Sequence, residues 1–148
     1  MKRNIPSRLS LKTSPFGVFL LIACFALASC HESLEERAAR DCAEETRRDC
    51  PRVMSPEMTM DSIVFDKATR TMHCHSTMSG SSDTINPQVD DFLRVQLLDA
   101  LVKETGNKAY KDAGFNFQYT FHSQKNAGKV LYDFIFTEKD YKKNCLPS

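Results

Sequence analysis

Two histidines flank a cysteine at His73-Cys74-His75, the stretch of the chain best suited to coordination chemistry. On a strand, alternate side chains face the same way, so both imidazoles would share one face. His122 and Asp133 occupy polar positions on two later predicted strands. Imidazoles and a carboxylate together can hold zinc. We interpret these three histidines and the aspartate as solvated polar residues, with a zinc site as the alternative.

The chain carries no motif of a known catalytic centre. It has neither a GxSxG nucleophile motif, nor a glycine-rich phosphate loop, nor the HExxH zinc motif. The serines near Gly80 fall in an expected turn, and the acid pairs Glu44-Glu45 and Asp90-Asp91 fall on expected helices, where they would be solvated. We therefore expect a non-enzymatic protein without a cofactor.

The first thirty residues have the organisation of an export signal. No acidic residue precedes Glu32, whereas four basic residues do: Lys2, Arg3, Arg8 and Lys12. Residues 16–28 are apolar apart from Gly17, a run shorter than the roughly 20 residues of a membrane-spanning helix. We expect this segment to be removed on export. Residues 26–28, Ala-Leu-Ala, would suit ordinary signal peptidase and simple secretion.

The tetrapeptide Leu27-Ala28-Ser29-Cys30 resembles the lipobox of bacterial prolipoproteins. In that family diacylglycerol is attached to the thiol, and the cysteine becomes the first residue. The resemblance implies a signal peptide over residues 1–29 and a single membrane-anchored domain over residues 30–148. More than one acyl chain, at about 0.8 kcal/mol per buried methylene, gives stable anchoring. Because His31 is not the aspartate that signals inner-membrane retention, the resemblance favours the outer membrane.

The remaining cysteines agree with a modified Cys30. One more leaves with the signal peptide, and the others form an even set of disulfide candidates: Cys42, Cys50, Cys74 and Cys145. In a continuous helix, Cys42 and Cys50 would lie about 12 Å apart, beyond disulfide reach. Each would then pair with Cys74 or Cys145. If the helix unwinds before Cys50, a 42–50 bridge with a 74–145 bridge is the alternative.

The charge balance argues against a nucleic-acid partner. Removal of residues 1–29 leaves 16 of the 20 Lys and Arg residues against 19 Asp and Glu, a net charge of −3. Nucleic-acid binding needs a concentrated basic face, which a net negative charge does not favour. Residues 30–148 have the length of one domain, whose modest core two disulfides would support by roughly 2–4 kcal/mol each.

Two helices are predicted, the first from the charges at its ends and a thin apolar stripe and the second from a cap and hydrophobic spacing. The first covers Ser33–Arg48, carries small apolar residues on one face, and would end before Pro51. The second opens at Asn86 and runs to about Thr105. Its apolar residues cover most of its circumference, so we expect the sheet to cover one face and the first helix or a loop to cover another. The alternative is a partner surface.

The strands are predicted as two antiparallel hairpins. The first joins Met58–Asp66 to Arg70–Met78, and the second joins GFNFQYTFH, which alternates strictly, to Val130–Phe136. A short last helix follows Thr137. The expected fold is α+β: an N-terminal helix, then ββαββ, with a disulfide-braced, four-stranded antiparallel sheet and helices packed on one face.

Several short features are similar to those of a set of small Gram-negative lipoproteins whose function is not known. They are Cys50-Pro51-x-Val53, the segment DSIVFD, and Gly114 ahead of an aromatic-alternating hairpin that contains Gly128. The resemblance covers most of residues 42–145. It implies the same α-ββ-α-ββ arrangement and brings no catalytic residues with it.

These observations favour a lipid-anchored envelope protein that binds or scaffolds another envelope component. Candidate surfaces are the polar sheet face around His73, His75, Gln118 and His122 and the second face of the Asn86–Thr105 helix. The alternatives are a small envelope inhibitor or ligand-binding module, using loops 80–86 and 123–128, and the zinc site. The triplets Asp61-Ser62-Ile63 and Asp83-Thr84-Ile85 resemble acceptors of bacterial O-glycosylation, at Ser62 and Thr84. A helix-entry role for Asp83 and Thr84 is the alternative.

Overall fold

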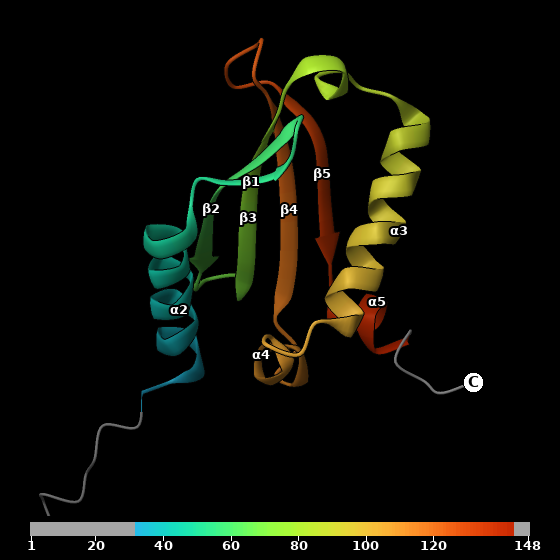
Figure 1. Ribbon diagram of the computed structural model, residues 1–148. Helices are drawn as coiled ribbons and strands as arrows, with labels where there is room; N and C mark the ends of the chain where they lie inside the picture. Colours follow the sequence, from blue (N-terminus) through green and yellow to red (C-terminus); the bar gives the residue numbers. More distant parts are fainter. Residues whose placement is uncertain (1–31, 144–148) are drawn as a thin grey trace, which may run out of the picture. The chain divides into compact units, whose positions relative to one another are not determined.

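A twisted sheet of five strands forms the centre of residues 32–143, the part of the chain that the computed structural model describes (Figure 1). Neighbouring strands are antiparallel except for β3 and β4, which are parallel. The strands lie in chain order: β1 (Arg52–Ser55), β2 (Met58–Asp66), β3 (Thr71–Met78), β4 (Asn116–Ser123) and β5 (Val130–Phe136). The predicted signal peptide, Cys30 and Cys145 lie outside the described residues.

The α+β class is confirmed, but the predicted four-stranded antiparallel sheet is wrong in two respects. A short fifth strand, β1, pairs with β2 at the sheet edge. The two predicted hairpins do form, yet they join side by side through the parallel pair β3–β4. The helix between them causes this, because a helical crossover carries the chain back to the end at which β3 began.

The first helix, α2 (Leu34–Asp49), begins and packs as its sequence predicts. Ser33 and Glu36 form a capping box, each side chain accepting a hydrogen bond from the other residue's backbone N–H. Thr46 fastens the helix to the sheet edge: its hydroxyl donates to the Ile63 carbonyl and accepts from the Ile63 N–H, both at 2.7 Å. Ala38 is buried on the same side, where its small side chain permits close approach.

The helix α3 (Pro87–Lys103) connects β3 to β4 after a 3-10 turn, η1 (Gly80–Ser82). The Asn86 side chain accepts from the Gln88 N–H at 3.0 Å, which confirms the predicted cap. Two short helices complete the described chain: α4 (Lys108–Asp112) and α5 (Glu138–Lys143). No helix within residues 32–143 combines the length and apolar character needed to cross a membrane.

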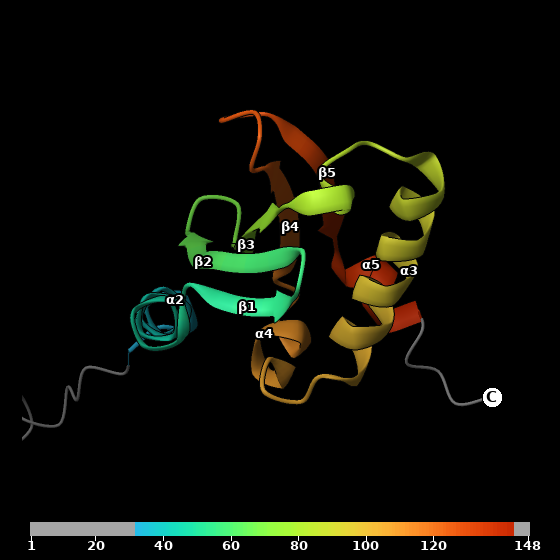
Figure 2. The ribbon, with the colours of Figure 1, turned by 45° about the horizontal axis from the view of Figure 1, so that its top comes forward.

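The core lies between these helices and one face of the sheet (Figure 2). Its largest side chains are aromatic, and the alternation of GFNFQYTFH places Phe115, Phe117 and Phe121 in it, each at most 3% exposed. Each of the four α-helices within residues 32–143 contributes a buried residue to the same cluster: Ala38, Leu101, Tyr110 and Tyr141. The predicted packing of helices on one face is therefore confirmed, and the polar face remains uncovered by the described helices.

Candidate functional site: a methionine-lined groove

A groove lies on the helical side of the sheet, between α2 and the C-terminal half of α3. It consists of two hollows of about 420 and 320 Å³, which share Glu104 and Asn107 and, on the floor, the side chains of Met60, Cys74 and Tyr119. These three residues come from β2, β3 and β4, so the floor spans the centre of the sheet. The three side chains lie in the groove because the strand register places them on the same face of the sheet as the buried aromatic residues.

The lining is apolar and adaptable. Beside the shared residues it contains Met54, Met58, Met72, Ile63 and Leu97. Methionine side chains are unbranched, flexible and polarisable, so they adjust to partners of different shape. A surface of this kind suits recognition of an apolar segment better than it suits a reaction.

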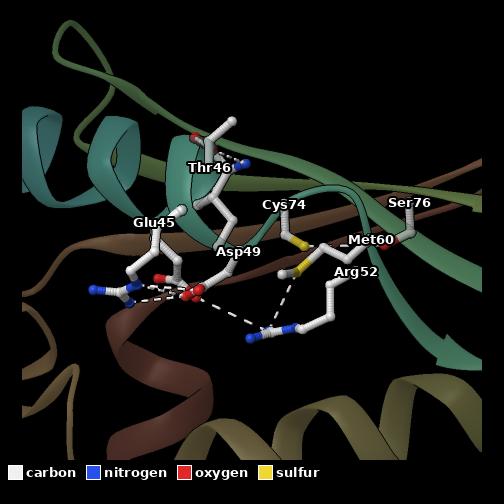
Figure 3. Close-up of polar contacts among 9 residues, drawn as sticks. Glu45, Thr46, Asp49, Arg52, Met60, Cys74 and Ser76 are labelled. Atoms are coloured by element: carbon white, nitrogen blue, oxygen red, sulfur yellow. Dashed lines mark hydrogen bonds and ion pairs between the residues drawn. The ribbon is translucent and has the colours of Figure 1, made fainter.

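The rim of the groove is acidic. Asp41, Glu45 and Glu104 line it together with one base, Arg52. The Arg52 guanidinium lies 3.9 Å from the Glu45 carboxylate and 3.8 Å from the Met60 sulfur, so it bridges the rim and the floor (Figure 3). Arg37 and Arg40 form ion pairs with Asp41 at 3.5 and 3.2 Å, so the negative charge of the rim is concentrated at Glu45 and Glu104. This charge favours a partner with basic residues beside its apolar ones.

The thiols in the groove are not activated. Burial raises the pKa of both Cys42 and Cys74 to about 11, so each is a neutral thiol at neutral pH. Only the thiolate is nucleophilic, and the nearest polar partner of the Cys74 sulfur is the Ser76 hydroxyl at 4.0 Å. The groove therefore lacks a cysteine nucleophile of the kind that a hydrolase or oxidoreductase uses.

The structure shows no disulfide among the described cysteines. Cys42, Cys50 and Cys74 are all free thiols, so the disulfide-braced sheet of the predicted fold is not observed in residues 32–143. The helix does continue to Asp49, as the argument against a 42–50 bridge requires. A bridge to Cys145 stays a prediction.

The histidines predicted to share a face do so. His73 and His75 on β3 have ring centroids 3.8 Å apart, and the His75 and His122 centroids lie 5.6 Å apart. All three rings lie on the face opposite the groove and are half-buried. The three histidines and Asp133 nevertheless separate into two hydrogen-bonded sets. His75 Nδ1 lies 3.3 Å from His122 Nε2, whereas His73 bonds to the Thr120 hydroxyl, which donates to Asp133.

Burial lowers the pKa of His73 and His75, and the neighbouring imidazoles lower it further. Both rings are consequently held toward the neutral form, in which a ring nitrogen has a free lone pair. Within residues 32–143, no three or more side chains of His, Cys, Asp and Glu converge closely enough to hold a metal ion. The predicted zinc site has four ligands, His73, His75, His122 and Asp133. The geometry does not bring these four side chains together around one point, and metal binding stays a prediction.

The second face of α3, which carries Val95, Leu98 and Val102, is covered only in part, and not by the first helix. Leu98 and Val102 pack against the core, whereas Val95 is 63% exposed, and Phe92 on the other apolar stripe is 62% exposed. The reason is the parallel arrangement of the strands: α3 packs near β5 and α5, while α2 packs on β2 across the groove.

The two predicted glycosylation residues differ in their surroundings. Thr84 is exposed in the loop before α3, and its carbonyl accepts a hydrogen bond from Tyr132 at 2.8 Å. Ser62 lies within β2 and is half-buried. Modification of either residue stays a prediction.

Sequence reasoning missed the groove. A signal was available, since Met58, Met60 and Met72 occur on the strands near Cys74 in place of the β-branched residues usual there. Their convergence depends on strand register and on the gap between two helices, neither of which is visible in the sequence.

Residues 33–132 match the family model described as a domain of unknown function, DUF8479, and the chain belongs to this family. The match covers α2 through the first residues of β5, and hence the whole lining of the groove. No curated protein matches the chain.

Three solved structures share the fold at low sequence identity. A candidate secreted protein from Pseudomonas aeruginosa has 16% identity and a TM-score of 0.58, over 74% of this chain and 97% of that one. The pilotin of the Vibrio vulnificus type 2 secretion system has 13% identity and a TM-score of 0.58, covering 78% and 94%. The type II secretion system pilotin of Vibrio cholerae has 13% identity and a TM-score of 0.54, covering 78% and 98%.

Proposed function

We propose that this protein is a lipid-anchored, non-enzymatic binding module of the bacterial envelope, whose groove holds an apolar segment of a partner protein. The groove carries the proposal. Its floor of Met60, Cys74 and Tyr119 is lined with flexible methionines, and its larger hollow of about 420 Å³ has room for several side chains. Its thiols are neutral, which fits binding and not catalysis.

The partner segment is an amphipathic helix with basic flanks. A helix docks in a groove by inserting apolar side chains spaced three and four residues apart. The methionines receive such side chains, while Glu45 and Glu104 face basic residues at the edges. The charge of the rim sets orientation and association rate more than affinity, because exposed pairs contribute little free energy.

A component of a secretion system is the partner that we favour. Two of the structures that share this fold are pilotins of type II secretion systems, and this fold spans 94% and 98% of those chains. The likeness supports a similar place in the envelope. The acidic, methionine-lined groove supplies the chemistry by which this chain would recognise such a component.

The membrane anchor is the lipid that we propose on Cys30, at the outer membrane. Only residues 31–33 separate Cys30 from Leu34, the first residue of α2. A fully extended chain of this length reaches about 14 Å, so a lipidated Cys30 would hold the module close to the membrane surface. Mass spectrometry of the mature amino terminus tests this proposal, with Cys30→Ser as the matched variant. An acylated Cys30 supports the anchor, and an unmodified terminus upstream of Cys30 overturns it.

Site-specific photo-crosslinking in the intact envelope tests the groove. A photoreactive amino acid replaces Met54, which lines the groove and is 50% exposed, or Val64, which lies on the opposite face and is 46% exposed. We expect one discrete adduct from position 54, identified by mass spectrometry as a secretion-system component, and none from position 64.

The variant Glu45→Lys reverses a rim charge and should reduce the adduct from position 54. Equal labelling from both positions, or no adduct from position 54 in a folded protein, would contradict the proposed groove function. Thermal unfolding of each variant establishes that the protein is folded.

A further inference from the structure

We propose that His75 and His122 form a binding site for a zinc-class divalent cation on the sheet face opposite the groove. The two residues lie on the adjacent parallel strands β3 and β4, and the separation between His75 Nδ1 and His122 Nε2 is 3.3 Å. The site is independent of the proposed groove function, because its ligands lie on the other face of the sheet.

The spacing of the two nitrogens matches tetrahedral zinc. Zinc–nitrogen bonds are about 2.0–2.1 Å long, so two nitrogens in a tetrahedral shell lie about 3.3–3.4 Å apart. The observed 3.3 Å lies in this range. Rotation of the two rings would direct both lone pairs at one ion, in place of the hydrogen bond that they otherwise share.

His73 is held apart from the pair by its own hydrogen bonds. The Thr120 hydroxyl donates its one proton to Asp133 Oδ1 at 2.6 Å, so it must accept from His73 Nε2, which lies 2.7 Å away. That bond occupies Nε2 and leaves only Nδ1 of His73 with a lone pair, and within the described residues no third ligand converges with His75 and His122. Gln118 also donates to Asp133, at 2.9 and 3.0 Å, and holds that carboxylate in place. The sequence-based set of four ligands thus reduces to two.

Negative charge on both sides supports a cation at this position. Asp61, the extra residue of a bulge in β2, accepts from the Thr77 hydroxyl at 2.8 Å, and its charge acts on His75. Asp133 on β5 acts on His75 from the other side. Within the described residues the protein supplies two ligands, and water completes the coordination of the ion.

The test is zinc binding to the purified full-length mature protein in detergent, measured by calorimetry with zinc chloride as the probe. We expect one zinc per chain. His75→Ala and His122→Ala should each weaken binding at least tenfold, because a single imidazole loses the chelate. His73→Ala is the matched control on the same face and should change the dissociation constant by less than threefold.

Nitrogen NMR of the imidazole rings provides a second measurement that needs no variant. Zinc should shift the resonances of His75 Nδ1 and His122 Nε2 and leave those of His73 in place. Absence of binding at millimolar zinc overturns the proposal. So does equal loss of affinity in His73→Ala, or zinc bound to thiol sulfurs with no change in the imidazole nitrogens.

Discussion

The Tyr110 hydroxyl donates a hydrogen bond of 2.6 Å to Asp41 Oδ2 and thereby joins α4 to α2, 69 residues apart in the chain. Both residues line the groove. Burial opposes ionisation of Asp41, but the hydrogen bonds from Tyr110 and Arg40 outweigh it and lower the pKa of this carboxyl. On the other partner, burial and the bond to Asp41 raise the pKa of Tyr110 to about 12.

Tyr110→Phe should destabilise the protein modestly and raise the pKa of Asp41. The variant keeps the ring and loses one charge-assisted hydrogen bond, so we expect the free energy of unfolding to fall by about 1 kcal/mol. The effect is small because the Asp41 side chain is 37% exposed and water replaces the lost donor. Urea unfolding measures the first change and an NMR titration of the carboxyl measures the second. A double-mutant cycle with Asp41→Ala that gives no coupling energy would refute this relationship.

Phe115→Ala should be among the most damaging single substitutions. Phe115 is 0% exposed, stacks on Phe65 at 5.4 Å between ring centroids, and lies under the Arg70 guanidinium at 4.4 Å. Deletion of a buried phenylalanine ring costs about 3–5 kcal/mol. Phe92→Ala removes the same ring from an exposed position and should change the free energy of unfolding by less than about 0.5 kcal/mol. Similar destabilisation of the two variants in denaturant unfolding would show that the core assignment is wrong.

The Glu57 carboxylate should make stability fall in acid. It accepts hydrogen bonds from the hydroxyl and backbone N–H groups of Ser82 and Ser81, which lower its pKa to about 2. Because the pKa in the folded state is depressed, this stabilisation is fully present above the ordinary value of 4.5 and is lost as pH falls through about 2.

Glu57→Gln should therefore lower the melting temperature at pH 7 and lose less stability than wild type between pH 5 and pH 2. Melting temperatures measured across that range test this. The matched control is Ser81→Ala with Ser82→Ala, which removes the two hydroxyl donors but keeps the two backbone N–H donors, and should reduce the acid sensitivity to a smaller extent. Parallel pH profiles for wild type and Glu57→Gln would contradict the role of this carboxylate.

The thiols should differ in reactivity once the protein is reduced. Burial raises the pKa of Cys42 and Cys74 to about 11, whereas Cys50 is less buried and its pKa is raised to a lesser degree. We expect iodoacetamide at pH 7.5 to modify Cys50 at least tenfold faster than Cys42 or Cys74, because only thiolate reacts. Peptide mapping follows the three rates, and equal rates would contradict the burial of the two groove thiols.

Mapping of unreduced protein from the envelope tests the predicted disulfides. A bridge from Cys145 to any of the three described cysteines would support the pairing expected from cysteine parity. Free thiols at Cys42, Cys50, Cys74 and Cys145 would contradict the predicted disulfides.

Local features were predictable because they depend on neighbours in the chain. The cap at Ser33, the cap at Asn86 and the alternation of GFNFQYTFH each specify a helix start or a strand face from residues a few positions apart. The predicted export signal rests on equally local features, a basic start and an apolar run, and stays a prediction.

Long-range features were decided by tertiary structure. The parallel pairing of β3 with β4 and the exposure of Phe92 follow from how α3 carries the chain across the sheet, and the edge strand β1 forms by pairing with β2. The groove exists because two helices leave the centre of one face uncovered, and its methionines meet only in this strand register.

The histidines show the same division. From the sequence, alternation was enough to place His73 and His75 on one polar face, because side-chain direction has a period of two residues. The register between β3 and β4 decides that His75 contacts His122 and that His73 forms a hydrogen bond with Thr120. Register depends on contacts 47 residues apart, and no pattern within either strand encodes it.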